Sequence, residues 1–292
     1  MNRMFLVIGS SGYVGSAFRR YLGTNNLPHT CLSLKNPSRP HREVLTEALK
    51  NCRPDFVISA AGYVGTPNVD ATETHKLECL DANISIPVLI ADVCREHGVP
   101  FGHVSTGCVY SGSKPGGAGF NEDDPPNFDF RHNNSGFYSG CKALAEEMLA
   151  EYPAVYIWRL RYPYSAFNHP KNYLSKLLRY STLVEARNSI SEIEEFAAAC
   201  VQCHLKKIPF GKYNITNPGS VTTREVVALL QKYNMAPGKE FRFFADEAEF
   251  LRTAAKVPRA NCVLDSSRIT GRGIHLTEVH EAIESCLKNW RA

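Results

Sequence analysis

The sequence predicts an α/β fold in which helices cover both faces of a parallel sheet. Short apolar runs of strand length recur through the first half of the chain and alternate with longer segments of helical composition. The runs are continuously apolar, which is typical of strands buried on both sides. A glycine-rich turn follows the first run and precedes the first helical segment. These observations indicate a doubly wound sheet with a nucleotide-binding turn near its start.

The elements are expected in a regular order. Strands are expected at residues 5–8, 29–34, 55–59, 100–105 and 154–160. Helices are expected at residues 14–22, 42–51, 77–97 and 138–151, the third of them tolerating Pro87. The loop at residues 111–126 is rich in glycine, proline and acidic residues, and it is expected to form a surface flap beside the active site.

The alternation loosens after residue 163. Helices are expected at residues 173–180, 190–205 and 223–233, and a strand at residues 213–216. Thr222 or Thr223 is suited to cap the last of these helices. The sequence therefore predicts a Rossmann-type NADP-binding domain at residues 1–163 and a smaller, mainly substrate-binding lobe at residues 164–292, with segments that interleave with the first domain.

Composition narrows the class of protein. The chain has 292 residues, 43% of them hydrophobic and 21% charged, with a net charge of +4 and no basic run. Binding to nucleic acid or to a membrane surface is therefore not indicated. No apolar stretch reaches transmembrane length. Ten scattered cysteines without an export signal favour reduced thiols in a cytoplasmic protein.

No metal site is expected. The ten histidines show no metal-ligand spacing. Cys200-Val-Gln-Cys203-His204 spells the attachment pattern of c-type haem, but it falls inside an expected helix, so we attribute it to chance.

The glycine-rich turn is the first candidate binding feature. Its spacing is G-x-x-G-x-x-G, between a strand and a helix, where glycines permit a tight turn and let backbone N–H groups approach a pyrophosphate. A glycine turn without a ligand is the alternative. The candidate cofactor-binding residues are Gly9, Ser10, Ser11, Gly12, Tyr13, Val14 and Gly15, together with Ala60, Ala61 and Gly62 after the third strand.

The second expected strand indicates which dinucleotide is bound. An NAD site usually offers a carboxylate to the ribose 2′-hydroxyl at the end of this strand. Here the first acidic residue is Glu43, whereas Lys35, Arg39 and Arg42 supply positive charge. Basic side chains suit a 2′-phosphate, so NADPH is expected in preference to NADH. The alternative is that these three residues are solvated surface charges.

Tyr138 and Lys142 form the main catalytic candidate. Residues four apart lie on one face of a helix, so the phenol and the ammonium are expected to share a pocket. A nearby cation is expected to lower the pKa of the tyrosine and make it a usable general acid. Thr106 ends the fourth strand, where ligands of open parallel sheets bind, and can hydrogen-bond a carbonyl oxygen beside Tyr138. The three residues predict carbonyl reduction by a nicotinamide cofactor.

The chain resembles the extended short-chain dehydrogenase/reductases. More narrowly, it is similar to the bifunctional UDP-4-keto-6-deoxy-glucose 3,5-epimerase/4-reductases of nucleotide-rhamnose synthesis. The similarity covers nearly the whole chain. Its motifs are Ala60-Ala-Gly62, Pro67-Asn-Val-Asp70, Ala91-Asp-Val-Cys-Arg-Glu96, Thr106-Gly-Cys108, Tyr138-Ser-x-x-Lys142, Asn172-Tyr-Leu-Ser-Lys176, Asn217-Pro-Gly219 and Pro258-Arg259.

The resemblance implies roles for further residues. Cys108 and Lys176 match a second acid/base pair of the epimerising relatives; the alternatives are a small buried cysteine and a solvated helix lysine. Asn83 matches a residue that orders the site, and the alternative is an asparagine bonded to backbone. The other implied substrate-binding residues are Arg161, Asn172 and Arg259, the last as a ligand of the diphosphate.

The reaction expected from the resemblance is NADPH-dependent 3,5-epimerisation and 4-keto reduction of UDP-4-keto-6-deoxy-D-glucose to UDP-β-L-rhamnose by a homodimer. Alternatives are another nucleotide-4-keto-6-deoxyhexose (a dTDP-, GDP- or N-acetylated sugar) or reduction alone. A non-catalytic dinucleotide-binding regulatory subunit is an alternative of another class, disfavoured by the intact Thr-Tyr-Lys set. Ser10–Tyr13 and Tyr162–Tyr164 depart from the plant enzymes' pattern and put the nucleotide and the sugar in doubt.

Overall fold

A six-stranded parallel sheet forms the centre of the computed structural model, which describes residues 3–35 and 39–291. The strands lie in the order β10-β5-β4-β3-β1-β2. They span Phe5–Ile8 (β1), His29–Leu32 (β2), Phe56–Ser59 (β3), Phe101–Thr106 (β4), Val155–Leu160 (β5) and Gly211–Asn214 (β10). Along the chain, β2 is added on one side of β1, whereas β3, β4 and β5 are added on the other. The order therefore reverses between β1 and β3, and a crevice forms at the carboxyl ends of these two strands. The prediction of a doubly wound parallel sheet is confirmed.

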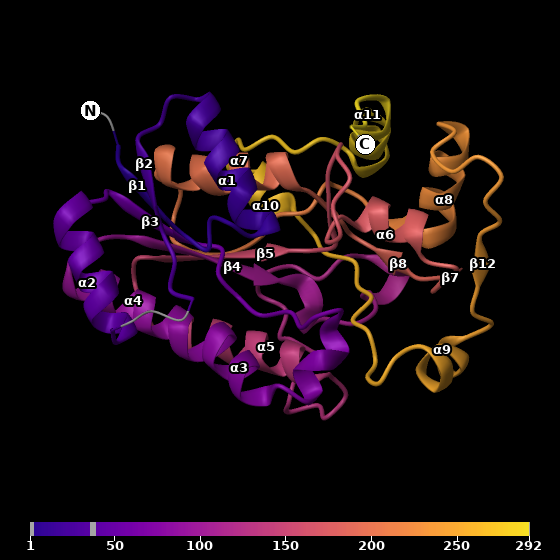
Figure 1. Cartoon of the computed structure of the whole chain (residues 1–292), viewed down its shortest axis with the longest axis horizontal. Helices are drawn as coiled ribbons and strands as arrows, with labels where there is room; N and C mark the ends of the chain where they lie inside the picture. The colour runs from indigo at the N-terminus through magenta and orange to yellow at the C-terminus, as the bar shows by residue number, and fades with distance from the viewer. Residues whose placement is uncertain (1–2, 36–38, 292) are drawn as a thin grey trace.

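Helices cover both faces of this sheet (Figure 1). One face carries α1 (Tyr13–Thr24) and α7 (Ile193–Leu205), which pack against each other. The other carries α2 (His41–Cys52), α4 (Ile86–Glu96) and α5 (Phe137–Ala150). Each layer has its own apolar cluster against the sheet. Because β1 and β3 are buried from both sides, their sequences are almost entirely apolar, without alternation. β4 is equally buried but carries His103, Ser105 and Thr106.

The helix expected at residues 77–97 is interrupted. It consists of α3 (Lys76–Leu80), a π-helical turn at Asp81–Ser85, and α4. Pro87 lies at the start of α4, directly after the π-helical turn. Across residues 3–35 and 39–291, no helix is long and apolar enough to cross a membrane.

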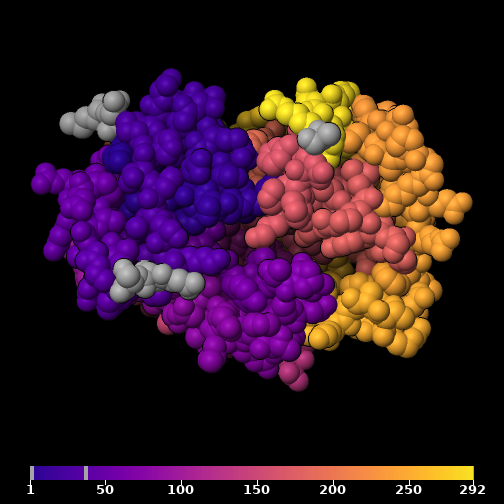
Figure 2. Space-filling view, in the orientation of Figure 1, coloured from indigo at the N-terminus to yellow at the C-terminus, as the bar shows by residue number. Residues whose placement is uncertain are grey.

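Residues beyond 163 contribute to both parts of the molecule. β10 pairs with β5, and α7 packs on α1, so this stretch completes the first domain. The remaining segments form a smaller lobe around a third apolar cluster, on the right in Figures 1 and 2. The boundary at residue 163 therefore divides the chain only in part.

The smaller lobe is built from short elements. Its helices include α6 (Tyr173–Arg179), α8 (Thr223–Lys232), α9 (Glu247–Thr253) and α11 (Val279–Lys288). Its strands are two residues long, at Pro163–Tyr164 (β6), Thr182–Leu183 (β7), Arg187–Asn188 (β8), Ser191–Glu192 (β9), Val221–Thr222 (β11) and Arg242–Phe243 (β12). Thr222 caps α8 in a reciprocal capping box with Glu225, as the sequence suggested. The sequence reasoning missed α9, α11 and the short α10 (Ser267–Thr270), which contacts β10.

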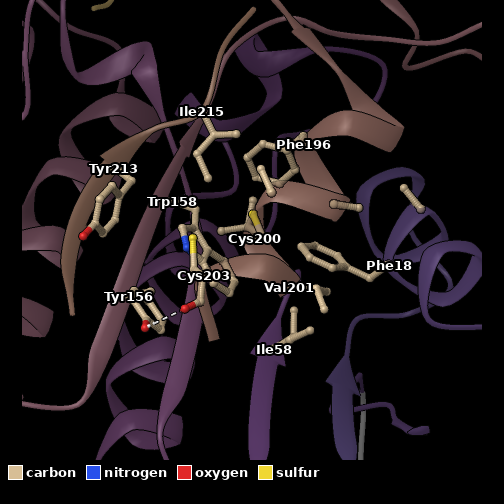
Figure 3. Close-up of a cluster of buried hydrophobic side chains, with 14 of the residues drawn as sticks. Phe18, Ile58, Tyr156, Trp158, Phe196, Cys200, Val201, Cys203, Tyr213 and Ile215 are labelled. Carbon is tan, nitrogen blue, oxygen red and sulfur yellow. Dashed lines mark hydrogen bonds between the residues drawn. The ribbon is translucent and has the colours of Figure 1, made fainter. Parts of the chain in front are cut away.

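Figure 3 shows the aromatic core under α1 and α7. Trp158 of β5 lies there with Tyr156, whose hydroxyl donates to the backbone oxygen of Cys203 at 3.1 Å. Cys200 and Cys203 are both fully buried in this core. Burial raises the pKa of Cys203 to about 12. The Cys-x-x-Cys-His sequence thus packs α7 against the sheet.

The expected flap is held against the rest of the protein. Two isolated bridges join it to a segment near the C-terminus, Gly112 to Cys262 and Phe120 to Leu264. The Phe120 ring stacks on Tyr110 with centroids 4.7 Å apart. A side chain at Gly119 would collide with the backbone of Leu264. The loop lies at the surface, as expected, and backbone pairing holds it to the segment around Cys262 and Leu264.

A buried ion pair connects α5 to the sheet. Arg159 of β5 and Glu146 of α5 are 0% and 2% exposed. Arg159 donates to both carboxylate oxygens, its Nη2 at 2.7 Å from Oε2. Ser105 of β4 donates to Glu146 at 2.6 Å, and Arg159 Nη1 donates to the Tyr110 hydroxyl at 3.0 Å. The helix that carries Tyr138 and Lys142 is thereby bonded to the two strands beneath it.

We expect Glu146→Gln to lower the free energy of unfolding by about 3–5 kcal/mol, because it leaves the Arg159 guanidinium buried without a carboxylate. Urea denaturation followed by circular dichroism measures this change. The adjacent Glu147 pairs with Arg131 at the surface, so Glu147→Gln should change stability by less than about 1 kcal/mol. Equal losses in the two variants would contradict a structural role for the buried pair.

Candidate active site

The glycine-rich turn lies between β1 and α1 at the crevice. Gly9 has a φ of +77° and accepts a hydrogen bond from the Gly12 N–H at 3.2 Å. A Cβ at Gly9 would lie 2.6 Å from the backbone nitrogen of Ala61, and one at Gly15 would lie 2.1 Å from the Gly9 oxygen. Ala60 and Ala61, after β3, thus pack directly on the turn. Only glycine fits at these two positions.

The first turn of α1 has neither a side-chain cap nor an acidic residue. Its N–H groups and the positive end of the helix dipole suit an anion. Ser10, Ser11 and Val14 are at least partly exposed along this turn. The Tyr13 side chain instead turns toward the smaller lobe, where its hydroxyl donates to Ser165 at 2.8 Å and its ring stacks on His169.

The basic residues near β2 occupy exposed positions. Arg39 pairs with Glu47, and Arg42 pairs with Asp92 and Glu96. Exposed ion pairs of this kind contribute little to stability, so they can be exchanged for a phosphate. Lys35 is exposed just after β2, and the neighbouring residues 36–38 lie outside the described part of the chain.

Asn83 fixes the loop that follows β3. It lies in the π-helical turn, is 1% exposed, and donates from Nδ2 to the Tyr63 oxygen at 2.8 Å. Its Oδ1 accepts the Tyr63 N–H at 3.3 Å and would lie 3.1 Å from a Cβ at Gly62. Asn83 therefore bonds backbone and orders the edge of the site.

Tyr138 lies in the first turn of α5 and is half-buried beside Thr106. Burial and the neighbouring Cys108 raise the pKa of the Tyr138 phenol, against smaller lowering effects of Thr106 and Arg161. The expectation of a lowered pKa is therefore wrong in this structure, because desolvation of the phenolate outweighs the nearby cations.

Lys142, one turn further along α5, is held to β4. Its Nζ donates to the Val104 oxygen at 3.1 Å and lies 3.2 Å from His103 Nε2. Burial lowers the pKa of Lys142 to about 8 and that of His103 well below its ordinary value. His103 is thus neutral, and its Nε2 can accept a hydrogen bond from the Lys142 ammonium. The sequence reasoning missed His103, although a histidine inside a strand expected to be buried was a signal.

Cys108 and Lys176 face the same region from different elements. Cys108 lies in a short 3₁₀ turn after β4, where its N–H donates to the Thr106 hydroxyl at 3.1 Å. Lys176 lies on α6 and is half-buried. Burial, Arg179 and Lys171 lower the pKa of Lys176, while Cys108 acts in the opposite direction. The turn that carries Cys108 packs on α5, the helix of Tyr138. Helix α6 reaches the same region where Tyr173 stacks on Tyr162, whose ring covers Arg161.

Asn172 positions α6. It is fully buried and caps the helix by accepting the Leu174 N–H at 3.0 Å. Its Nδ2 donates to oxygens of Ser165 and Phe167. The side chain is thus committed to the fold, and it sets the start of the helix that carries Lys176.

Arg161 and Arg259 occupy different surroundings. Arg161 is buried and donates to the Cys108 sulfur at 2.9 Å. Arg259 binds both Asp70 oxygens at 2.7 Å and lowers the Asp70 pKa, against the effect of burial. A cavity of about 130 Å³ lies beside Arg259 in the smaller lobe. Sequence reasoning missed its other lining residues, which are Val184, Glu185, Phe244, Ala245, Asp246, Glu247, Phe250 and Asn261.

Comparison with protein families shows to which family this chain belongs. The model described as the RmlD substrate binding domain matches residues 3–292. The chain belongs to the RmlD family. It is 31% identical over 284 residues to an Arabidopsis thaliana bifunctional dTDP-4-dehydrorhamnose 3,5-epimerase/dTDP-4-dehydrorhamnose reductase, covering 96% of this chain and 90% of that protein. The prediction of an extended short-chain dehydrogenase/reductase is confirmed.

A longer relative from the same plant is also similar to this RmlD-family chain. It is the trifunctional UDP-glucose 4,6-dehydratase/UDP-4-keto-6-deoxy-D-glucose 3,5-epimerase/UDP-4-keto-L-rhamnose-reductase, 31% identical over 284 residues. The match covers 96% of this chain and 41% of that protein.

Two solved structures share the fold. The L780 UDP-rhamnose synthase from Acanthamoeba polyphaga mimivirus has a TM-score of 0.89 at 20% identity, covering 99% of this chain and all of that one. The dTDP-4-dehydrorhamnose reductase from Bacillus anthracis, in complex with NADP, has a TM-score of 0.81 at 17% identity, covering 99% of each chain.

We expect the Lys142 ammonium to lose its proton at about pH 8. A lysine in water does so near pH 10.5, and burial disfavours the charged form. NMR of protein with ¹³C-labelled lysine Cε measures the titration, and the signal missing from Lys142→Met assigns it. A Lys142 signal that titrates above pH 10 would contradict this expectation.

The same shift has a consequence for stability. Between about pH 8 and 10.5 the unfolded chain binds the Lys142 proton and the folded one does not. The cost of burying the charge is therefore complete below pH 8 and disappears as the pH rises. The stability of the wild type relative to Lys142→Met should increase over this interval.

Proposed function

We propose that this protein is an NADPH-dependent 3,5-epimerase and 4-reductase that converts UDP-4-keto-6-deoxy-D-glucose into UDP-β-L-rhamnose. The observation that carries the proposal is that the turn bearing Cys108 packs on α5, the helix of Tyr138, while α6, the helix of Lys176, reaches the neighbouring Tyr162 through Tyr173. A reductase needs the tyrosine, whereas an epimerase needs two further groups that exchange protons with carbon. Similarity to plant proteins that combine epimerase and reductase in their names supports the same pair of activities here.

NADPH is the proposed cofactor. The glycine turn and the uncapped start of α1 suit its pyrophosphate. Lys35, Arg39 and Arg42 supply positive charge for its 2′-phosphate. When bound, NADPH supplies a hydride for the ketone. The NADP complex of the Bacillus anthracis reductase, which shares the fold, supports this choice.

The reduction step uses Thr106, Tyr138 and Lys142. Tyr138 and Thr106 would hydrogen-bond the C4 ketone oxygen of the substrate. The raised pKa of Tyr138 keeps its phenol protonated, so it can donate a proton to that oxygen as C4 is reduced. The Lys142 ammonium, fixed by Val104 and His103, supplies positive charge close to the tyrosine.

The epimerisation step uses the same oxygen. Protons on C3 and C5 are acidic because both carbons adjoin the C4 ketone, and removing one forms an enolate. Tyr138 and Thr106 would stabilise the enolate oxygen by hydrogen bonds. Cys108 and Lys176 then act as a pair: one removes the proton from carbon, and the other returns a proton to the opposite face.

The cavity beside Arg259 is the proposed site of the nucleotide. Two aromatic side chains, Phe244 and Phe250, line it together with Arg259 and Asn261. Aromatic rings suit a base, and the Arg259 guanidinium would bind phosphate oxygens by exchanging the Asp70 carboxylate for them. The UDP form is favoured by the names of the trifunctional plant relative and the mimivirus synthase.

A homodimer is proposed from an exposed apolar face on α5. Leu144 and Met148 follow Gly140 at intervals of four residues, so the three lie on one side of the helix. Both side chains are about 40% exposed, and the exposed Phe130 lies over Gly140. On α3, which packs on α5, Leu77 is 81% exposed. A second copy of this chain would cover this face.

We expect turnover of UDP-4-keto-6-deoxy-D-glucose with NADPH in D₂O to place deuterium at C3 and C5 of the product. Cys108→Ser and Lys176→Met should each lose deuterium incorporation at least about 100-fold, because each removes one proton-exchanging group. Both should still reduce pre-epimerised UDP-4-keto-L-rhamnose, since Thr106, Tyr138 and Lys142 are intact. NMR of the product and NADPH absorbance give the two rates.

Cys31→Ser and Lys50→Met are matched controls at exposed positions and should behave as the wild type. NADPH oxidation without deuterium at C3 and C5 in the wild type would exclude epimerisation. Faster turnover of the corresponding dTDP sugar would overturn the choice of UDP.

We expect Leu144→Glu combined with Met148→Glu to convert the protein into a monomer, because the two carboxylates would be buried without partners at the interface. Sedimentation velocity measures the mass. Lys212→Glu, on the edge strand β10, is the control and should leave the mass unchanged. A wild type that sediments as a monomer at micromolar concentration would refute the dimer.

A further inference from the structure

Arg161 is a buried cation without a carboxylate. It follows β5 directly, and its side chain is 2% exposed. Within the described residues, no Asp or Glu oxygen lies within 4.0 Å of its guanidinium. Burial alone would lower the pKa of Arg161, but Cys108 and its other neighbours raise it, so the side chain is charged. A buried charge of this kind is costly unless other groups compensate it.

The compensating contacts point the guanidinium at the candidate active site. Nη2 donates to Asn188 Oδ1 at 2.7 Å and to the backbone oxygen of Ala260. Nη1 donates to the Cys108 sulfur at 2.9 Å. The planar face lies 3.7 Å from the centre of the Tyr162 ring. One edge of the guanidinium is thus fixed to neutral oxygens, and the other is bonded to the thiol.

The neighbouring Arg159 shows what is unusual here. Both arginines end the same strand, and both are fully buried. Arg159 has the carboxylate of Glu146 as its partner. In the described part of the chain, Arg161 has no carboxylate partner and bonds instead to the Cys108 sulfur, which becomes negatively charged when the thiol loses its proton. The nearest group able to neutralise Arg161 is therefore Cys108 in its thiolate form.

We propose that Arg161 is a positioning residue for Cys108, which holds the Sγ atom in one direction and stabilises its negative charge whenever the thiol has given up its proton. This inference rests on the proposed function, in which Cys108 exchanges protons with the substrate. The charge-assisted bond from a fixed guanidinium removes the need for the sulfur to find another donor as the proton moves.

Tyr162 completes the arrangement. Its backbone has a φ of +33°, which is uncommon for a residue with a side chain. This conformation accompanies the stacking of its ring over Arg161 on one side and Tyr173 of α6 at 5.1 Å. The ring covers the guanidinium face, which leaves the Cys108 bond in a region of low dielectric where it is strong.

Other titratable groups also face Cys108. They are Tyr138 and Lys142 of α5, Lys176 of α6, and Cys262. The Lys142 ammonium is already used by Val104 and His103. Of the cations around the thiol, Arg161 has the direct bond, and its charge does not titrate near neutral pH.

The first test compares Arg161→Met with the wild type. Deuterium incorporation into UDP-4-keto-6-deoxy-D-glucose should fall about 100-fold, as when one preorganised donor to a charged atom is removed. Reduction of UDP-4-keto-L-rhamnose should change much less. Arg161→Lys keeps a charge but cannot bond Cys108, Asn188 and Ala260 at once, so we expect an intermediate loss. Equal losses of exchange and reduction in both variants would overturn the inference, because they would indicate a general structural role.

The second test needs no substrate and again compares Arg161→Met with the wild type. Alkylation by iodoacetamide, read by peptide mass spectrometry, is compared between Cys108 and the exposed Cys31. If Arg161 stabilises charge on the sulfur, the ratio of the Cys108 rate to the Cys31 rate at a fixed pH of about 7.5 should fall at least about tenfold in Arg161→Met, because the thiolate is the reacting form. An unchanged or higher ratio in the variant would refute the inference.

The two levels of proposal fail differently. If Cys108→Ser exchanges deuterium at the wild-type rate, the proposed role of Cys108 is wrong. Suppose instead that Cys108→Ser loses exchange, while Arg161→Met exchanges at the wild-type rate and keeps the wild-type alkylation ratio. The proposed function then stands, and the role of Arg161 is wrong.

Discussion

The bond between Glu146 and Arg159 is the constraint on which the site depends. Thr106 ends β4, and Tyr138 and Lys142 lie on the first two turns of α5, so their mutual positions follow from how α5 sits on β4 and β5. The buried carboxylate bonds both strands at once, through Ser105 and Arg159. Because a buried ion pair tolerates little displacement, α5 has one register on the sheet. Thr106 and Tyr138 meet as a result of that register.

Desolvation dominates the chemistry of the site. The same burial raises the pKa of Tyr138 and lowers those of Lys142 and Lys176. Each shift disfavours the charged form. It brings the pKa values of the two lysines closer to neutrality and moves that of the tyrosine further away. The tyrosine is a donor that stays protonated, and the lysines are cations that can release a proton. Arg161, which cannot, is the fixed charge among them.

Sequence reasoning located the sheet, the glycine turn and the Tyr138–Lys142 helix, because buried parallel strands and glycine spacing leave clear local patterns. Sequence reasoning failed for properties that depend on contacts between residues far apart in the chain. The sign of the Tyr138 pKa shift depends on neighbours from three other segments. The fixed loop at residues 111–126 depends on pairing with Cys262 and Leu264. Asn172 looked like a ligand by its motif, yet its amide is used within the fold.

After residue 163 the chain adds α7 and β10 to the first domain. This limits how the smaller lobe can be exchanged between members of the family. A cut at residue 163 would remove β10 and α7, leaving β5 as an exposed edge and uncovering Tyr156 and Trp158. An unpaired apolar edge invites aggregation. A substrate lobe from another family member could therefore not be grafted at one junction. It would have to enter as two inserts, on either side of residues 191–215. A change of sugar specificity by exchange of the lobe therefore requires that both inserts remain compatible with α7 and β10.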